Sequence, residues 1–172
     1  MGGSKHIVLV HGACLGGWSW FKVATRLRAA GYRVDAPDLA ASGADPRPLR
    51  EVPTFRDYTA PLLDLLAALP AGDRVVLVGH SLGGLSVALA AELFPDKVAS
   101  AVFLCAFMPD CAARPSHVLE KVRATNRDLP IELFLSRRAC PCHLIFLEIV
   151  RDVSLSGLTM QPPCVSPASP LW

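Results

Sequence analysis

The stretch Arg74-Val75-Val76-Leu77-Val78-Gly79-His80-Ser81-Leu82-Gly83 decides the fold of this chain. Its apolar start predicts a buried strand over 74–79, and the small residues that follow predict a helix over 82–94. Between them lies a Gly-x-Ser-x-Gly turn, the pattern of a nucleophile elbow. In such a sharp turn the serine has strained backbone angles, and only glycine fits where the strand and the helix nearly touch. Ser81 is therefore the candidate nucleophile, with Gly79 and Gly83 as the close-packing positions.

A second motif, His11-Gly12-Ala13-Cys14-Leu15-Gly16-Gly17-Trp18, follows the strand-like run 6–10. A His-Gly turn after an early strand is one half of an oxyanion hole, and the residue after the nucleophile supplies the other half. The N–H groups of Ala13 and Leu82 are the candidate donors. The alternative is the glycine-rich turn of a nucleotide-binding protein. Its glycine spacings are not matched here, and no Gly-Lys-Ser/Thr occurs.

Alternating strands and helices organise the chain up to about residue 120. Apolar, strand-like runs at 6–10, 32–36, 74–79 and 98–106 alternate with helix-like stretches at about 18–30, 54–69 and 82–94. Short apolar strands in this order predict an α/β fold, with a mostly parallel sheet and helices on both faces. Prolines between residues 37 and 53 predict a surface loop after the second strand.

Length and composition limit the classes of protein. A chain of 172 residues, 52% of them hydrophobic, suits a single domain. The net charge of +2 gives no reason to expect a nucleic-acid or membrane partner. No long apolar run predicts a membrane span, and the first residues do not form a signal peptide. We therefore expect a cytoplasmic protein. Its six cysteines, with Cys14 and Cys105 in apolar segments, are expected to be reduced and mostly structural thiols.

Five motifs in one order resemble the plant methylesterase and hydroxynitrile lyase family of α/β-hydrolases, which includes salicylate and jasmonate methylesterases. They are His11-Gly12-Ala13-Cys14, Trp18-x-Trp20, Asp38-Leu39-Ala40-Ala41-Ser42-Gly43, Gly79-His80-Ser81-Leu82-Gly83-Gly84 and Ala101-Val102-Phe103-Leu104-x-Ala106-Phe107-Met108-Pro109. The match runs from about His6 to Glu120.

This resemblance implies hydrolysis of methyl esters of small plant hormones of the salicylate, jasmonate and indole-acetate class. It implies no cofactor and no metal, and its partner would be a small-molecule ester or carboxylic acid. It makes Ser81 the nucleophile and Ala13 and Leu82 the oxyanion donors. The elbow and pocket would be formed by Gly12, Trp18, Gly79, His80, Gly83 and Phe107.

Two positions separate the esterase branch of the family from the lyase branch. The lyases resemble this chain but carry threonine after the histidine of the first motif and cysteine after the nucleophile. Here those positions hold Gly12 and Leu82, as in the esterases. Because a lyase needs the extra hydroxyl to bind a cyanohydrin, esterase descent is favoured.

The last part of the chain departs from the family after about residue 120. A serine nucleophile needs a histidine base oriented by an acid, in the chain order Ser, Asp or Glu, His. Asp152 follows the apolar run 144–150 and is a weak candidate for the acid. An acidic residue that merely ends an apolar segment and has no catalytic role would give the same pattern. His143 precedes that run, and no histidine follows it. No catalytic histidine is therefore assigned, and Cys140, Cys142 and His143 do not have zinc-site spacing.

These features predict a core over residues 1–120 and a divergent tail over 121–172. The tail includes a Pro- and Ser-rich part at 161–170 that is expected to be disordered. The expected sheet lacks the C-terminal strands and helix of the family. Three interpretations follow: a methylesterase that is weak or inactive for lack of its base, a non-catalytic small-ligand-binding protein, or a non-functional truncated product. The sequence leaves the oligomeric state open.

Overall fold

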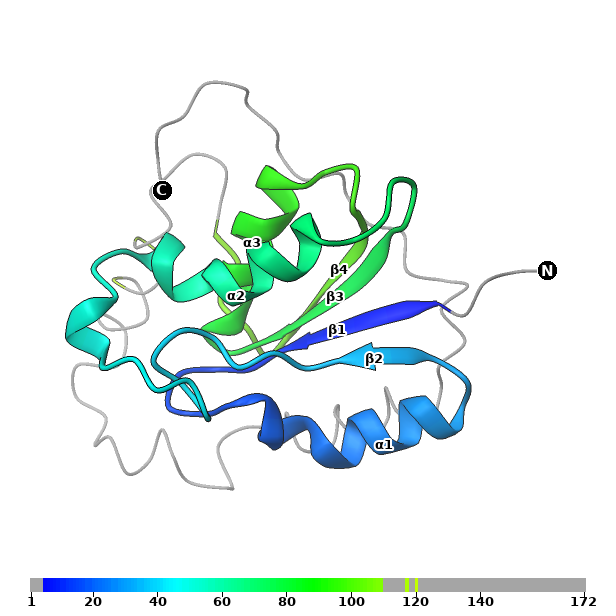
Figure 1. Cartoon of the computed structure of the whole chain (residues 1–172), viewed down its shortest axis with the longest axis horizontal. Helices are drawn as coiled ribbons and strands as arrows, with labels where there is room; N and C mark the ends of the chain where they lie inside the picture. Colours follow the sequence, from blue (N-terminus) through cyan, green and yellow to red (C-terminus); the bar gives the residue numbers. More distant parts are fainter. Residues whose placement is uncertain (1–4, 110–116, 118–119, 121–172) are drawn as a thin grey trace.

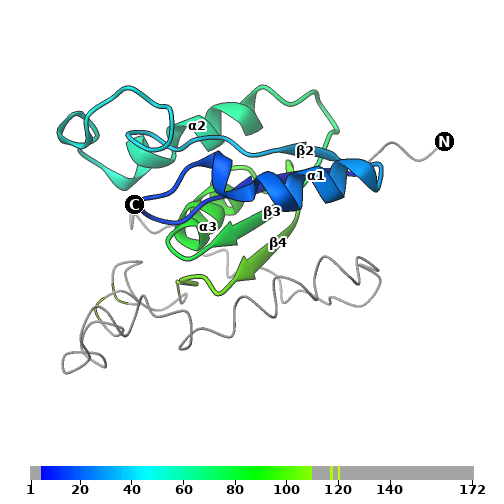
Figure 2. The same ribbon diagram turned by 90° about the horizontal axis from the view of Figure 1, so that it is seen from below.

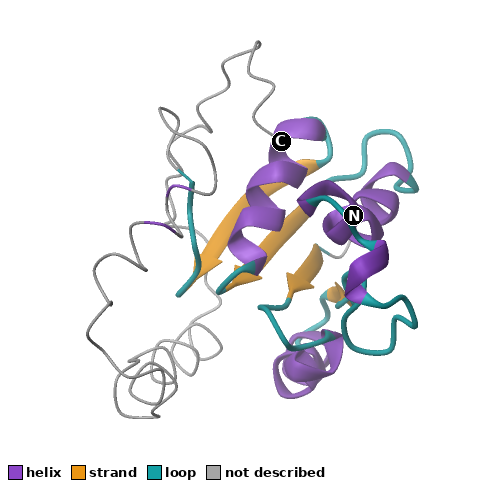
Figure 3. Ribbon diagram, turned by 90° about the vertical axis from the view of Figure 1, so that its left-hand side faces the viewer, coloured by secondary structure: helices purple, strands orange, loops and turns teal. Residues whose placement is uncertain are grey.

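The computed structural model describes residues 5–109, together with residues 117 and 120 (Figure 1). Its strands are β1 (His6–Val10), β2 (Arg33–Asp35), β3 (Val75–His80) and β4 (Val98–Leu104). Its helices are α1 (Phe21–Ala29), α2 (Phe55–Ala67) and α3 (Gly83–Leu93), with two 3-10 turns, η1 (Gly17–Trp20) and η2 (Leu49–Glu51). The four strands, drawn as orange arrows in Figure 3, are parallel, and their order is β2-β1-β3-β4 (Figure 1). The predicted α/β fold is confirmed.

The elements differ from the predictions mainly at their ends. The helix expected from residue 18 begins as the 3-10 turn η1, in which the N–H of Ser19 bonds to the carbonyl of Gly16, and α1 begins at Phe21. The strand expected to reach residue 106 ends at Leu104, because Cys105 has a φ of +44° and leaves the extended conformation. Strand β4 forms one edge of the described sheet (Figure 2).

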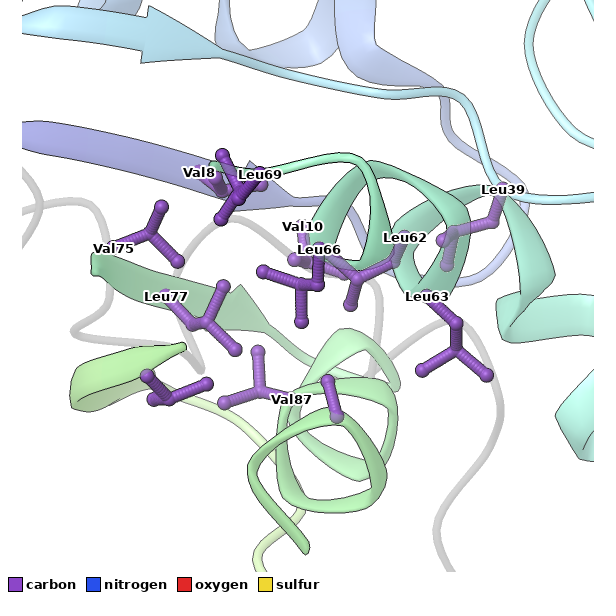
Figure 4. Close-up of a cluster of buried hydrophobic side chains, with 12 residues drawn as sticks. Val8, Val10, Leu39, Leu62, Leu63, Leu66, Leu69, Val75, Leu77 and Val87 are labelled. Carbon is purple, nitrogen blue, oxygen red and sulfur yellow. The ribbon is translucent and has the colours of Figure 1, made fainter. Parts of the chain in front are cut away.

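Side chains of β1 and β3 alternate between two hydrophobic cores on the two faces of the sheet. Val8, Val10, Val75 and Leu77 pack against side chains of α2 and α3 (Figure 4). Ile7 and Leu9 pack on the opposite face, against side chains of η1 and α1. Because helices cover both faces, β1 is continuously apolar over 7–10 and β3 over 75–78, as parallel strands usually are.

Helices α2 and α3 begin in different ways. Thr54 accepts a hydrogen bond from the N–H of Asp57, whose carboxylate bonds back to the N–H of Thr54, so a capping box starts α2. Helix α3 has no side-chain cap and is apolar on nearly all sides, as expected for a buried central helix. The hydroxyls of Thr59 and Ser86, both fully buried, join the two helices at 3.0 Å.

The predicted boundary near residue 120 stays a prediction, because beyond residue 109 the structure describes only residues 117 and 120. The tail over 121–172, with Asp152, the run 144–150 and the cysteine-histidine segment at 140–143, lies outside the described residues. Within the described part of the chain, none of the helices has the length and apolar character needed to cross a membrane.

A candidate active site at the carboxyl edge of the sheet

The first two loops of the site leave neighbouring strands at the same edge. From β1 the chain goes to β2 on one side and later to β3 on the other. In α/β sheets, ligands bind at the carboxyl edge where the strand order reverses in this way. The register pairs Val10 with Gly79, and continuing it places Gly12 opposite Ser81. A Cβ atom on Gly12 would lie 2.9 Å from the Cβ of Ser81, so the two turns touch.

Ser81 has the strained backbone that the elbow motif predicts. Its φ is +53°, in the left-handed region that a residue with a side chain rarely adopts. Gly79 and Gly83 make the turn possible, because a Cβ at Gly79 would lie 2.8 Å from the carbonyl oxygen of Gly83. A Cβ at Gly83 would lie 2.5 Å from the carbonyl oxygen of His11. The strand and the helix thus approach too closely for any side chain at either glycine.

Two main-chain hydrogen bonds hold the carbonyl group of Ser81. The N–H of Gly84, in the first turn of α3, donates to it at 3.1 Å. The N–H of Phe107, in the segment after β4, donates to it at 3.0 Å. A Cβ on Gly84 would clash with the carbonyl oxygen of Phe107, so this segment passes directly over the start of the helix. Phe107 therefore contributes to the site through its backbone.

The two candidate oxyanion donors border the same cavity. Ala13 and Leu82 both line it, and neither N–H donates a hydrogen bond to any residue that the structure describes. Helix α3 starts at Gly83, so the positive end of its dipole also lies at this edge. Two free N–H groups beside a helix N-terminus can stabilise a negatively charged oxygen.

The cavity has a volume of about 690 Å³, within the range of small-molecule sites. Its walls come from the loop after β1 and from η1, with Trp18, from the long loop before α2, with Leu49, and from the start of α2, with Phe55 and Tyr58. The described lining carries no charged side chain. Its polar groups include the hydroxyls of Ser42 and Tyr58, which lie 3.3 Å apart. The cavity therefore suits an uncharged, largely apolar molecule with few polar groups.

Asp38 fastens the two loops that form the cavity. One carboxylate oxygen accepts a hydrogen bond from the N–H of Gly17 at 2.6 Å, and the other accepts one from the N–H of Ala44 at 2.9 Å. Within the second loop, the Arg47 guanidinium bonds to the carboxylate of Asp45 and holds the pKa of that carboxyl well below its usual range. The sequence marked Asp38 only as part of a family motif, because nothing local indicates that its carboxylate bonds to Gly17, 21 residues earlier in the chain.

Two histidines near the nucleophile are engaged elsewhere. His11 is fully buried and bonds to the main chain at Gly12 and Leu39. His80 lies edge-on to the buried ring of Trp20, with ring centroids 6.3 Å apart, and burial lowers its pKa. No histidine within residues 5–109 is hydrogen-bonded to Ser81. The same part of the chain contains no cluster of three metal-binding side chains.

The predicted site residues fall into three groups. Ala13, Trp18 and Leu82 line the cavity. The residues beside it, which do not line it, are Gly12, Gly79, Ser81, Gly83, His80 and Phe107. Asp152 lies outside the described residues.

Two of the six cysteines lie in the described residues, and their thiols are free, as predicted, but are not buried in apolar surroundings. Cys14 and Cys105 are free and exposed. Both have a positive φ, +59° and +44°, in turns that follow strands, and such turns carry the side chain away from the sheet. Cys14 therefore lines the cavity beside Ala13.

Comparison with known proteins agrees with this architecture. Residues 5–137 match the alpha/beta hydrolase fold family. The chain is 52% identical over 137 residues to salicylic acid-binding protein 2 of Nicotiana tabacum, covering 80% of this chain and 52% of the relative. It is 55% identical over 174 residues to methylesterase 1 of Arabidopsis thaliana, covering 92% and 66% of the two chains.

Among solved structures, the crystal structure of polyneuridine aldehyde esterase superposes with a TM-score of 0.71 at 46% identity. The aligned part covers 77% of this chain and 51% of that protein. The chain thus spans about half to two thirds of the length of the relatives that it matches.

Proposed function

The chain belongs to the α/β-hydrolase family, and we propose that it is a serine carboxylesterase of the methylesterase type whose turnover is weak, because no histidine base is assigned to it. The observation that carries this proposal is Ser81, at a φ of +53° between β3 and α3, beside a cavity lined by Ala13 and Leu82. The names of the relatives, methylesterase 1 and polyneuridine aldehyde esterase, support ester hydrolysis. We also propose a cytoplasmic location, as the sequence resemblance implies.

In the proposed reaction, the Ser81 oxygen forms a bond to the ester carbonyl carbon and its proton passes to a general base. The carbonyl oxygen becomes an oxyanion, which the N–H groups of Ala13 and Leu82 stabilise. The carbon–oxygen bond to the alcohol then breaks, methanol takes up the proton, and water releases the acid from the serine. The base and its orienting acid are not among the described residues, and Asp152 stays our proposal for the acid.

The substrates that we propose are methyl esters of small ring-bearing plant acids, such as methyl salicylate and methyl jasmonate. The volume of the cavity and its uncharged walls with Trp18, Phe55 and Tyr58 support a neutral, ring-bearing substrate. The product acid would be an anion at neutral pH, and no cation among the described lining residues would compensate its charge. We therefore expect the ester to bind more tightly in this cavity than the free acid.

Hydrolysis of methyl salicylate and methyl jasmonate by the purified chain tests the proposal, with release of acid followed by chromatography. Ser81→Ala should reduce turnover to the rate of the buffer, while Ser100→Ala should leave it unchanged. Ser100 is the matched control because its hydroxyl bonds only to the adjacent Ala99 carbonyl, on strand β4. Turnover that survives Ser81→Ala, or no turnover of any ester together with no labelling of Ser81 by a fluorophosphonate, would overturn the proposal.

A second candidate function is binding of a small acid or ester without turnover. It is favoured by the name of the relative salicylic acid-binding protein 2, and by the absence of a bond between Ser81 and any histidine within residues 5–109. Salicylate or methyl salicylate should then raise the melting temperature of wild type and Ser81→Ala equally, with no acid released. Hydrolysis that depends on Ser81 would exclude it.

A further inference from the structure

We propose that His11 is a positioning residue, which sets the direction of the Ala13 N–H in the oxyanion hole. The inference rests on the proposed esterase function and adds a residue to its machinery. His11 is 0% exposed and stands directly after β1, between the sheet and the turn that carries Ala13. Both of its ring nitrogens contact the main chain, Nδ1 at the Gly12 carbonyl and Nε2 at the Leu39 N–H.

These two contacts define the protonation of the imidazole. The N–H of Leu39 can only donate, so Nε2, at 3.0 Å, accepts and carries no hydrogen. The Gly12 carbonyl can only accept, so Nδ1, at 2.8 Å, carries the hydrogen and donates. The imidazole is therefore neutral, with both nitrogens in use. It has no free nitrogen with which to take a proton from Ser81.

The carbonyl that His11 holds belongs to the same peptide unit as the Ala13 N–H. A peptide unit is planar, and in the trans form its C=O and N–H point in opposite directions. No cis peptide occurs in the described chain, so fixing the Gly12 carbonyl also fixes the Ala13 N–H. Because Gly12 lacks a side chain, its own backbone restrains this unit weakly. The carbonyl also accepts a longer bond of 3.3 Å from the N–H of Leu15.

The far side of His11 is held by a rigid part of the cavity wall. Leu39 is fully buried, and it follows Asp38, whose carboxylate binds the N–H groups of Gly17 and Ala44. The loop after β1 is thus fastened to the loop after β2 at both ends, by His11 at its start and by Asp38 near its end. This arrangement aims the Ala13 N–H before any substrate binds.

The effect of such a group appears in the transition state. A correctly aimed N–H stabilises the charge that develops on the carbonyl oxygen and adds little to binding of the neutral ester. Loss of the His11 bond to Gly12 should therefore lower kcat and leave KM nearly unchanged. A residue that only maintained the fold would change stability without this separation.

Two substitutions each preserve one of the two hydrogen bonds of His11 and remove the other. His11→Asn places an amide N–H near the position of Nδ1 and keeps the bond to Gly12. His11→Gln places an amide oxygen near the position of Nε2 and keeps the bond to Leu39. Each variant of the full chain loses one buried hydrogen bond, so thermal unfolding should report similar destabilisation. His11→Gln should lower kcat at least tenfold, toward the roughly 100-fold loss seen when one oxyanion donor is removed, whereas His11→Asn should stay within about threefold of wild type.

Equal losses of kcat in the two variants, in proportion to their loss of stability, would overturn the inference and leave His11 a structural residue. A second measurement does not depend on turnover. Nitrogen-15 NMR of the wild-type chain should report the hydrogen on Nδ1, and the Ala13 amide resonance should move in His11→Gln and stay in place in His11→Asn. A hydrogen on Nε2, or an Ala13 resonance that moves equally in both variants, would refute it. If the wild type hydrolyses no ester, the proposed function fails, while this NMR test of His11 still stands.

Discussion

The N–H of Phe107 donates a hydrogen bond of 3.0 Å to the carbonyl of Ser81, and so joins the end of β4 to the nucleophile elbow. Gly12 contacts the same serine from the other side, where a Cβ would come within 2.9 Å of the Ser81 Cβ. The strained residue is thus confined between the segments that follow β1 and β4. A positive φ at a residue with a side chain persists only where its surroundings impose it.

The strain at Ser81 predicts an unusual order of stabilities. Glycine adopts a φ of +53° without the steric penalty that any Cβ brings. Ser81→Gly should therefore be about 1 kcal/mol more stable than Ser81→Ala, as expected when a strained left-handed residue loses its side chain. Urea unfolding of the two inactive variants measures the difference. Equal stabilities would mean that the elbow carries no strain.

The capping box of α2 predicts a stability difference between two exposed threonines. Thr54→Ala removes the hydroxyl that accepts the N–H of Asp57 and should cost about 1 kcal/mol. Thr25→Ala is the matched control, because Thr25 lies within α1 and its hydroxyl bonds only to the Phe21 carbonyl one turn earlier. That change should stay within about 0.5 kcal/mol of wild type. Thermal unfolding monitored by circular dichroism compares the two, and a similar loss in both would count against the cap.

The buried hydroxyl pair between α2 and α3 predicts a strong coupling. Thr59→Val leaves the hydroxyl of Ser86 buried without its partner and should cost about 1–3 kcal/mol. Adding Ser86→Ala removes the remaining polar group, so the double variant should be less destabilised than the two single changes together. Chemical denaturation of all four proteins gives the coupling. Additive losses would indicate that the two hydroxyls do not interact.

Burial of His80 predicts loss of stability in weak acid. Its pKa in the folded chain lies below the ordinary value of 6.5, because protonation would place a charge in a largely buried position against Trp20. The neutral ring therefore contributes stability above pH 6.5, and this contribution is lost as the pH falls through the lowered pKa. His80→Gln should flatten the decline in unfolding free energy between about pH 7 and pH 5, the range in which a histidine titrates. An unchanged slope in the variant would place the titrating group elsewhere.

The strands and the elbow were predictable from local sequence because they depend on local chemistry. Apolar runs specify buried parallel strands, and the glycines on either side of Ser81 specify a turn that admits no side chain at those two positions. The cavity was not predictable in the same way. Its wall at Leu49 belongs to a loop that Asp38 ties, through the N–H of Gly17, to a segment 21 residues earlier in the sequence. For the same reason the sequence indicated the turn that contains His11, but not which main-chain groups its two nitrogens bind.

The pairing of Val10 with Gly79 also limits how this scaffold can acquire new chemistry. Continued by two residues, this pairing places position 12 opposite the nucleophile. The residue at position 12 therefore determines which group lies beside the side chain of Ser81. Hydrogen is the only occupant that the present spacing accepts without movement of a neighbour. A lineage that placed a hydroxyl-bearing side chain at position 12 would have to shift the two turns apart by a few tenths of an ångström. The spacing of two adjacent strands thus limits which side chains this architecture can place beside its nucleophile.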